Sequence, residues 1–146
     1  MSTRANILLT ESYTWKDAKG KEKTTTDTLY FYRHSDGYPE GTLPTLNIFM
    51  DWLKNGKIRP DLQQCGGWLI MLGALEYNTI PKYKTELEMS FGREIETTNI
   101  STIEPPNDWK VGAYEPTTAI HGDIEYLYTV NLTSLTIEVK KVNFGK

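Results

Sequence analysis

Polar and apolar residues alternate along the first part of the chain with the two-residue period of half-buried β-strands. The period covers residues 5–10 and again 28–34, and the second run consists mainly of residues that favour strands. In that run, alternation places Arg33 on the face of a leucine and a phenylalanine, and His34 on the face of two tyrosines. Residues 17–20 read Asp-Ala-Lys-Gly, a turn signal, so we expect the two strands to pair as a long hairpin.

The spacing changes to that of helices in the middle of the chain. Thr-Leu-Pro at residues 42–44 predicts a helix start with Pro44 near its first position, and Gly56 is placed to end this helix. Asp61 can cap a second helix over residues 62–76, which is apolar nearly all round and is therefore expected to be buried. Glycines within this second helix would let another backbone or a ligand approach closely. The apolar stripe of the first helix consists of Leu46, Phe49, Met50 and Leu53.

The C-terminal third alternates again and predicts three strands, at residues 110–114, 120–130 and 135–139. Residues 77–109 have no clear period and contain several prolines, so we expect an irregular insertion there. This order of elements predicts one α+β domain over residues 1–146. Its sheet is expected to be mostly antiparallel, made of an N-terminal hairpin and a C-terminal meander, and covered by two central helices.

Composition and charge limit the classes of function. A chain of 146 residues, 38% of them hydrophobic and 24% charged, can bury a core without metal ions or disulfide bonds. The net charge of −3 argues against general nucleic-acid binding, which needs a basic surface, but leaves room for a local basic pocket that binds one small anion. The most basic run is interrupted by acidic residues and is interpreted as a solvated hairpin tip; its lysines are Lys16, Lys19, Lys21 and Lys23.

The chain also carries signals of its compartment. Its N-terminal residues do not resemble a signal peptide, and no apolar stretch reaches the length of a membrane span. Cys65, the single cysteine, excludes a disulfide bond within the chain and suits a reducing compartment. Because Cys65 lies in an apolar stretch, it is interpreted as a core residue rather than a catalytic thiolate. We therefore expect a soluble protein of the cytoplasm.

Each of the two histidines is followed two positions later by an aspartate: His34 by Asp36, and His121 by Asp123. The two pairs could together bind a divalent metal ion. Alternatively, one histidine could act as a general base while Arg33 stabilises a developing negative charge. In a third interpretation the same groups bind an anionic or nucleotide-like ligand without catalysis, and in a fourth the Ser-Asp-Gly run simply closes a turn. No zinc-site spacing supports the first interpretation, so neither a metal ion nor another cofactor is expected.

Binding is the functional interpretation that we favour. Alternation puts Arg33 on an apolar face, so it is either buried with a partner or placed at the mouth of a pocket. The turn after it leads into the predicted helix start, whose free backbone N–H groups favour a nearby anion. The predicted ligand-binding residues are Arg33, His34, Ser35, Asp36, Tyr38, His121, Asp123 and Tyr126.

Four segments resemble a group of small phage- and prophage-associated bacterial proteins: residues 2–6, 32–39, 67–70 and 121–128. The second reads Tyr-Arg-His-Ser-Asp-Gly-Tyr-Pro and the fourth His-Gly-Asp-Ile-Glu-Tyr-Leu-Tyr. The resemblance covers both ends and the helical middle, and it carries no catalytic residues over to this chain. It implies a phage setting, the cytoplasm of a host cell, and an accessory role against host defence.

We therefore expect a binding protein for a small anionic, nucleotide-like ligand that sequesters a host signal. One alternative is a small hydrolase or phosphodiesterase that uses His34 and His121. A second is a protein inhibitor of a host defence effector, with residues 77–109 as its contact loop. Exposed sheet edges and many aromatic residues also suggest a homodimer or a higher homo-oligomer.

Overall fold

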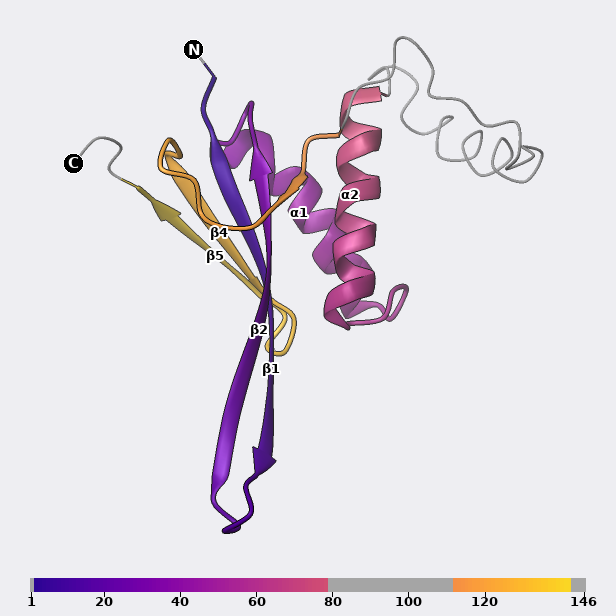
Figure 1. The fold of residues 1–146 in the computed structure, drawn as a ribbon. Coiled ribbons are helices and arrows are strands. Elements are labelled where there is room, and N and C mark those ends of the chain that lie inside the picture. Colours follow the sequence, from indigo (N-terminus) through magenta and orange to yellow (C-terminus); the bar gives the residue numbers. More distant parts are fainter. Residues whose placement is uncertain (1, 79–111, 143–146) are drawn as a thin grey trace, which may run out of the picture.

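Five strands form one mixed sheet, and two helices cover one of its faces (Figure 1). This computed structural model describes residues 2–78 and 112–142. The strand order is β3-β2-β1-β4-β5, and every neighbouring pair is antiparallel except the parallel pair β1–β4. The α+β class and the mostly antiparallel sheet are therefore confirmed. The elements are β1 (Ala5–Lys16), β2 (Glu22–Arg33), α1 (Pro39–Lys54), α2 (Leu62–Asn78), β3 (Glu115–Thr117), β4 (Tyr126–Asn131) and β5 (Thr136–Lys141).

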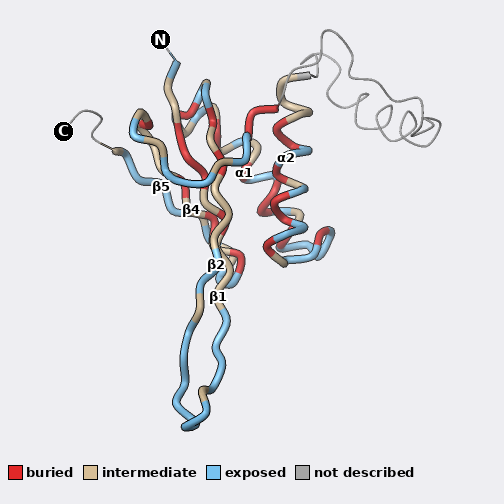
Figure 2. The backbone as a smooth tube through the Cα atoms, viewed as in Figure 1, coloured by how far each residue is buried: buried red, intermediate tan, exposed pale blue. Residues whose placement is uncertain are grey.

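The predicted hairpin forms, and both of its strands are longer than the alternation indicated. All twelve residues of β1 pair with β2, from Ala5 opposite Arg33 to Lys16 opposite Glu22. At the tip, the carboxylate of Asp17 accepts hydrogen bonds from the backbone N–H groups of Lys19 and Lys21, each at 2.9 Å. Gly20 has a φ of 78°. The outer half of the hairpin extends beyond the helices as an exposed two-stranded ribbon (Figures 1 and 2). Its alternation was weak because neither of its faces is covered.

The first helix begins earlier than predicted. It starts at Pro39, whose fixed φ suits the first helical position, while Pro44 lies within the helix. The predicted end is confirmed, because Asn55 caps α1 and Gly56 follows with a φ of 68°. For α2, the predicted cap is also found: the side chain of Asp61 accepts a hydrogen bond from the backbone N–H of Gln64, the third residue of the helix.

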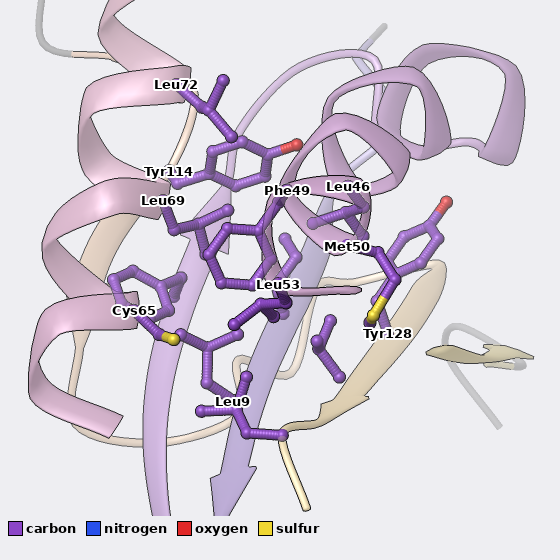
Figure 3. Packing of buried hydrophobic residues seen from close by; sticks show 14 of the residues in the cluster. Leu9, Leu46, Phe49, Met50, Leu53, Cys65, Leu69, Leu72, Tyr114 and Tyr128 are labelled. Atoms are coloured by element: carbon purple, nitrogen blue, oxygen red, sulfur yellow. The ribbon is translucent and has the colours of Figure 1, made fainter. Parts of the chain in front are cut away.

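The core lies between the helices and the β1–β2–β4 part of the sheet (Figure 3). At Gly73 the backbone of α2 lies against residues 113–114, where an added Cβ would come within 2.9 Å of two backbone nitrogens. This is the close approach that the glycines predicted. Cys65 is fully buried, donates to the carbonyl of Arg59 at 3.2 Å, and its pKa is raised by burial to about 12, which agrees with a core role. The labelled core side chains include Leu9, Leu46, Phe49, Leu53, Leu69, Leu72, Tyr114 and Tyr128.

The C-terminal strands differ from their predicted bounds. The first is β3, after the predicted range 110–114, because residues 112–114 pack against α2 instead. The predicted strand 120–130 begins only at Tyr126. Because β3 lies at the edge beside β2, β4 and β5 are the only two of the three described C-terminal strands that pair with each other. The predicted insertion, and with it the contact loop of a protein inhibitor, lies almost wholly outside the described residues. No helix among the described ranges is long and apolar enough to cross a membrane.

Candidate functional site

The segment between β3 and β4 crosses the open face of the sheet, away from the helices. It must cross two strands, because β3 pairs with β2 while β4 pairs with β1 on the other side (Figure 1). Asn6 holds it there: this fully buried side chain accepts the backbone N–H of His121 at 2.7 Å and donates to the carbonyl of Phe31 at 2.8 Å. Asn6 points to the open face because its neighbours in β1 are core residues. Residues 120–125 are thus a loop fixed onto the sheet.

His121 lies flat against Tyr32. The two ring centroids are 4.0 Å apart and the planes differ by 17°. The Nε2 atom of His121 lies 2.9 Å from the hydroxyl of Thr117 in β3, so the imidazole is held on both its face and its edge. This arrangement fixes the ring on the sheet surface.

The hydroxyl of Tyr32 donates to the carboxylate of Asp123 at 3.0 Å. Burial and this hydrogen bond to a negative group raise the pKa of Tyr32 to about 12, so the phenol remains a donor at neutral pH. The same carboxylate oxygen of Asp123 lies 3.5 Å from Nε of Arg4, and both side chains are more than a third exposed. The partly exposed side chain of Arg4, whose Nε is buried, therefore lies beside the carboxylate that Tyr32 contacts.

His34 also lies near Tyr32. Its ring centroid is 6.1 Å from that of Tyr32, and its side chain is exposed. Both imidazoles thus lie near one tyrosine ring on one face of the sheet. The name open-face cluster is used below for Arg4, Tyr32, His34, Thr117, His121 and Asp123.

Arg33 points to the face of the sheet that the helices cover, and it is buried with a partner. Burial with a partner is one of the two possibilities that the alternation pattern allowed. Its guanidinium pairs with both carboxylate oxygens of Glu76 near the end of α2. Its other hydrogen bonds go to the backbone carbonyls of Ser35, Asp36 and Gly41, and its Cζ lies 5.2 Å from the ring centre of Tyr114. Burial lowers the pKa of Arg33, but the bond to Glu76 raises it and prevails. Through the ion pair and these hydrogen bonds, the side chain of Arg33 joins β2 to α2, the turn and α1.

The turn after Arg33 is tied to the body of the protein by its backbone. Asp36 has a φ of 57°, and its side chain accepts a hydrogen bond from the hydroxyl of Tyr38 at 3.3 Å. The carbonyl of Gly37 accepts a hydrogen bond from the buried hydroxyl of Tyr128 at 2.6 Å. Ser35 lies 3.4 Å from Ser2, oxygen to oxygen. These contacts are those of a structural turn.

The predicted residues therefore divide between two faces of the sheet. His34, His121 and Asp123 come together on the open face, whereas Arg33 and Tyr126 face the helices and Ser35, Asp36 and Tyr38 form the turn. Arg4, Asn6 and Thr117 were not predicted as site residues. The only signal for Asn6 is a polar residue within an otherwise apolar strand, and its contact with His121 spans 115 positions.

The arrangement of acidic and imidazole groups bears on metal binding. Within residues 2–78 and 112–142, no three histidine, cysteine or carboxylate side chains are grouped so that they could hold a metal ion. The chain matches no protein-family model, and no curated protein or solved structure was found to match it. The open-face cluster is therefore interpreted from its own geometry.

Proposed function

We propose that the protein binds a small anionic, nucleotide-like ligand at the open-face cluster. The observation that carries this proposal is the stack of His121 on Tyr32, with the partly exposed, positively charged side chain of Arg4 near it. Stacked rings with N–H donors at their edge suit a ligand that has both a flat base and a phosphate. The proposed site thus keeps His34, His121 and Asp123 and replaces Arg33 by Arg4.

Each group of the cluster has a role in this proposal. His34 is exposed and the side chain of Arg4 is partly exposed. In the proposal both contact a phosphate, and Arg4 exchanges its contact with Asp123 for one with the ligand. Asp123 would then accept a hydrogen bond from a hydroxyl or amino group of the ligand. Asn6 and Thr117 position His121 rather than contact the ligand.

The setting of this proposal comes from the resemblance to phage-associated proteins. A protein that binds a nucleotide without consuming it lowers the concentration of the free nucleotide. In an infected cell, such sequestration would silence a defence pathway that depends on that signal. Sequestration needs a stoichiometric complex and no turnover, and a surface that binds without a metal ion or a nucleophile would suffice for it.

Thermal-shift measurements with cyclic and linear nucleotides test the proposal, with inorganic phosphate and adenosine as separate probes. At least one nucleotide is expected to raise the melting temperature more than either fragment does. Arg4→Ala should abolish this shift, while Arg59→Ala, at an exposed arginine with 75% relative side-chain exposure, should retain it. If no nucleotide stabilises the wild type, or if the two variants behave alike, the proposal is wrong.

Hydrolysis is the second candidate, because both imidazoles lie near Tyr32. One would remove a proton from water while the other donates a proton to the leaving oxygen. Mass spectrometry of the ligand after incubation and denaturation of the protein distinguishes the two functions. A binding protein returns the ligand unchanged, whereas an enzyme returns a product that disappears in His34→Ala and His121→Ala.

A further inference from the structure

Within the described residues, the outer edge of β2 is unpaired over most of its length. β3 pairs only with Tyr30, Phe31 and Tyr32, and among the described residues no strand lies beside Glu22–Leu29 on that side. This part of β2 belongs to the ribbon that extends beyond the helices (Figure 1). It contains no proline and no bulge, so its free N–H and C=O groups can pair with another strand.

The residues that would form those bonds can be derived from the register. Pro116, opposite Phe31, has no N–H group, so the bonds between β3 and β2 must involve Tyr30 and Tyr32. Because the bonding direction alternates along a strand, Thr24 and Thr26 also present their backbone groups to the outside, whereas Thr25 bonds toward β1. An antiparallel partner must match this alternation.

We propose that a second copy of the chain pairs with this edge, antiparallel and about a two-fold axis at Thr25. Thr24 then exchanges backbone hydrogen bonds with the partner's Thr26, which fits the derived alternation. Lys23 comes to lie opposite the partner's Asp27, and the partner's Lys23 opposite Asp27. The neighbours between these charged pairs are Thr24, Thr25 and Thr26, and threonine favours such pairing.

Charge selects this register over its neighbours. Shifting the axis by one residue, to Thr24 or Thr26, also matches the backbone alternation, but Lys23 would then face a threonine or a leucine. An axis at Thr24 would place Asp27 opposite the partner's Lys21 instead, but Lys21 lies outside β2. Within one chain, Asp27 lies opposite Glu11 across the hairpin, a like-charge pair that is unfavourable. Among the ion pairs of the described ranges, neither Lys23 nor Asp27 has a partner. The partner's Lys23 would supply Asp27 with the missing opposite charge.

Analytical ultracentrifugation of the full chain over a range of concentrations tests the association. The edge is short and polar, so a reversible dimer is expected, populated as the concentration rises. Lys23→Asp and Asp27→Lys should each weaken it by about tenfold, because attraction becomes repulsion at both symmetric pairs. The double variant should restore it, and the control Lys19→Asp at the hairpin tip should not change it. A monomer at all concentrations, or a double variant no better than the single ones, overturns the proposal.

Oxidative cross-linking tests the register itself. At the two-fold axis the two Thr25 residues form a non-hydrogen-bonded pair, whose Cα atoms in antiparallel sheets lie about 4.5 Å apart, close enough for a disulfide bond. Thr25→Cys should therefore give a covalent dimer, whereas Thr24→Cys, displaced from its own copy, should not. Equal cross-linking of both variants, or none with Thr25→Cys, contradicts the proposed register. The native Cys65 does not interfere, because it is fully buried.

Discussion

The imidazole of His121 lies 4.0 Å from the ring of Tyr32, centroid to centroid and nearly parallel to it. Tyr32 lies in β2 and His121 in the loop between β3 and β4, so the alternation pattern alone does not predict that they meet. Their contact is possible because Asn6 binds the backbone of His121 from beneath. The candidate site is thus a product of the chain crossing its own sheet.

Asn6→Ala should loosen this crossing segment. The change leaves the N–H of His121 and the carbonyl of Phe31 without their side-chain partner, at a cost of about 1–3 kcal/mol in the free energy of unfolding. Urea denaturation measures this cost. Asn47→Ala, at an exposed position of α1, is the matched control and should have little effect. Equal stability of the two variants would show that Asn6 does not hold the loop.

Stability should fall in alkaline solution as buried phenols ionise. Burial raises the pKa of Tyr114 and Tyr128 to about 12, and burial together with Asp123 does the same for Tyr32, against 10.0 for a free phenol. A pKa raised by folding gives stability that is complete below the unfolded value. This stability is therefore lost from about pH 10 to about pH 12.

Urea midpoints at about pH 9 and about pH 11 measure this loss. Tyr32→Phe removes one of the three phenols, so the variant should lose less stability than the wild type between these two pH values. Tyr13→Phe, at a tyrosine that is 49% exposed, is the control and should behave like the wild type. A wild-type midpoint that is independent of pH across this range would contradict the assignment.

Arg33→Ala should destabilise the whole fold rather than affect binding alone. It leaves Glu76 without its cation and removes one donor from each of three backbone carbonyls, and breaking a buried ion pair typically costs about 3–5 kcal/mol. The exposed control Arg59→Ala should cost less than about 1 kcal/mol. Chemical denaturation followed by circular dichroism compares them. If Arg33→Ala folds with wild-type stability but loses ligand binding, Arg33 belongs to the ligand site, as the sequence pattern predicts.

Two glycines of α2 should respond to alanine in opposite ways. At Gly73 the new Cβ would come within 2.8 Å of the backbone nitrogen of Tyr114, so the helix and residues 112–114 would have to move apart. At Gly67 nothing lies within 4 Å, and alanine is favoured in a helix by about 1 kcal/mol. Melting temperatures should therefore fall for Gly73→Ala and rise for Gly67→Ala. A fall for both would mean that Gly67 also has a contact role.

Alternation and helical spacing predicted the hairpin, both helices and the direction of Arg33, because these features depend on local burial. The strand predicted over residues 120–130 begins only at Tyr126. Ile120, Gly122 and Ile124 continue the two-residue period, but they pair with no strand among the described residues. Whether such a segment forms a strand depends on which neighbour it meets. Here the neighbour is the side chain of Asn6, which fixes a loop.

The candidate site was predicted in part. The sequence singled out both His-x-Asp pairs, but it could not assign their partners, because the nearest contacts of His121 come from β1, β2 and β3. The clustering of charged and aromatic residues after β2 drew attention to the turn. The structure shows that this turn is held by Arg33 and Tyr128 from the core side.

Nuclear magnetic resonance of the two histidines tests the proposed ligand site most directly. The chain has only His34 and His121, so their imidazole signals can be followed separately during titration with a nucleotide that stabilises the protein. Both signals should shift and saturate together in the wild type, and the shifts should disappear in Arg4→Ala. If a bound nucleotide leaves both histidine signals unchanged, the ligand site lies elsewhere and the open-face cluster is structural.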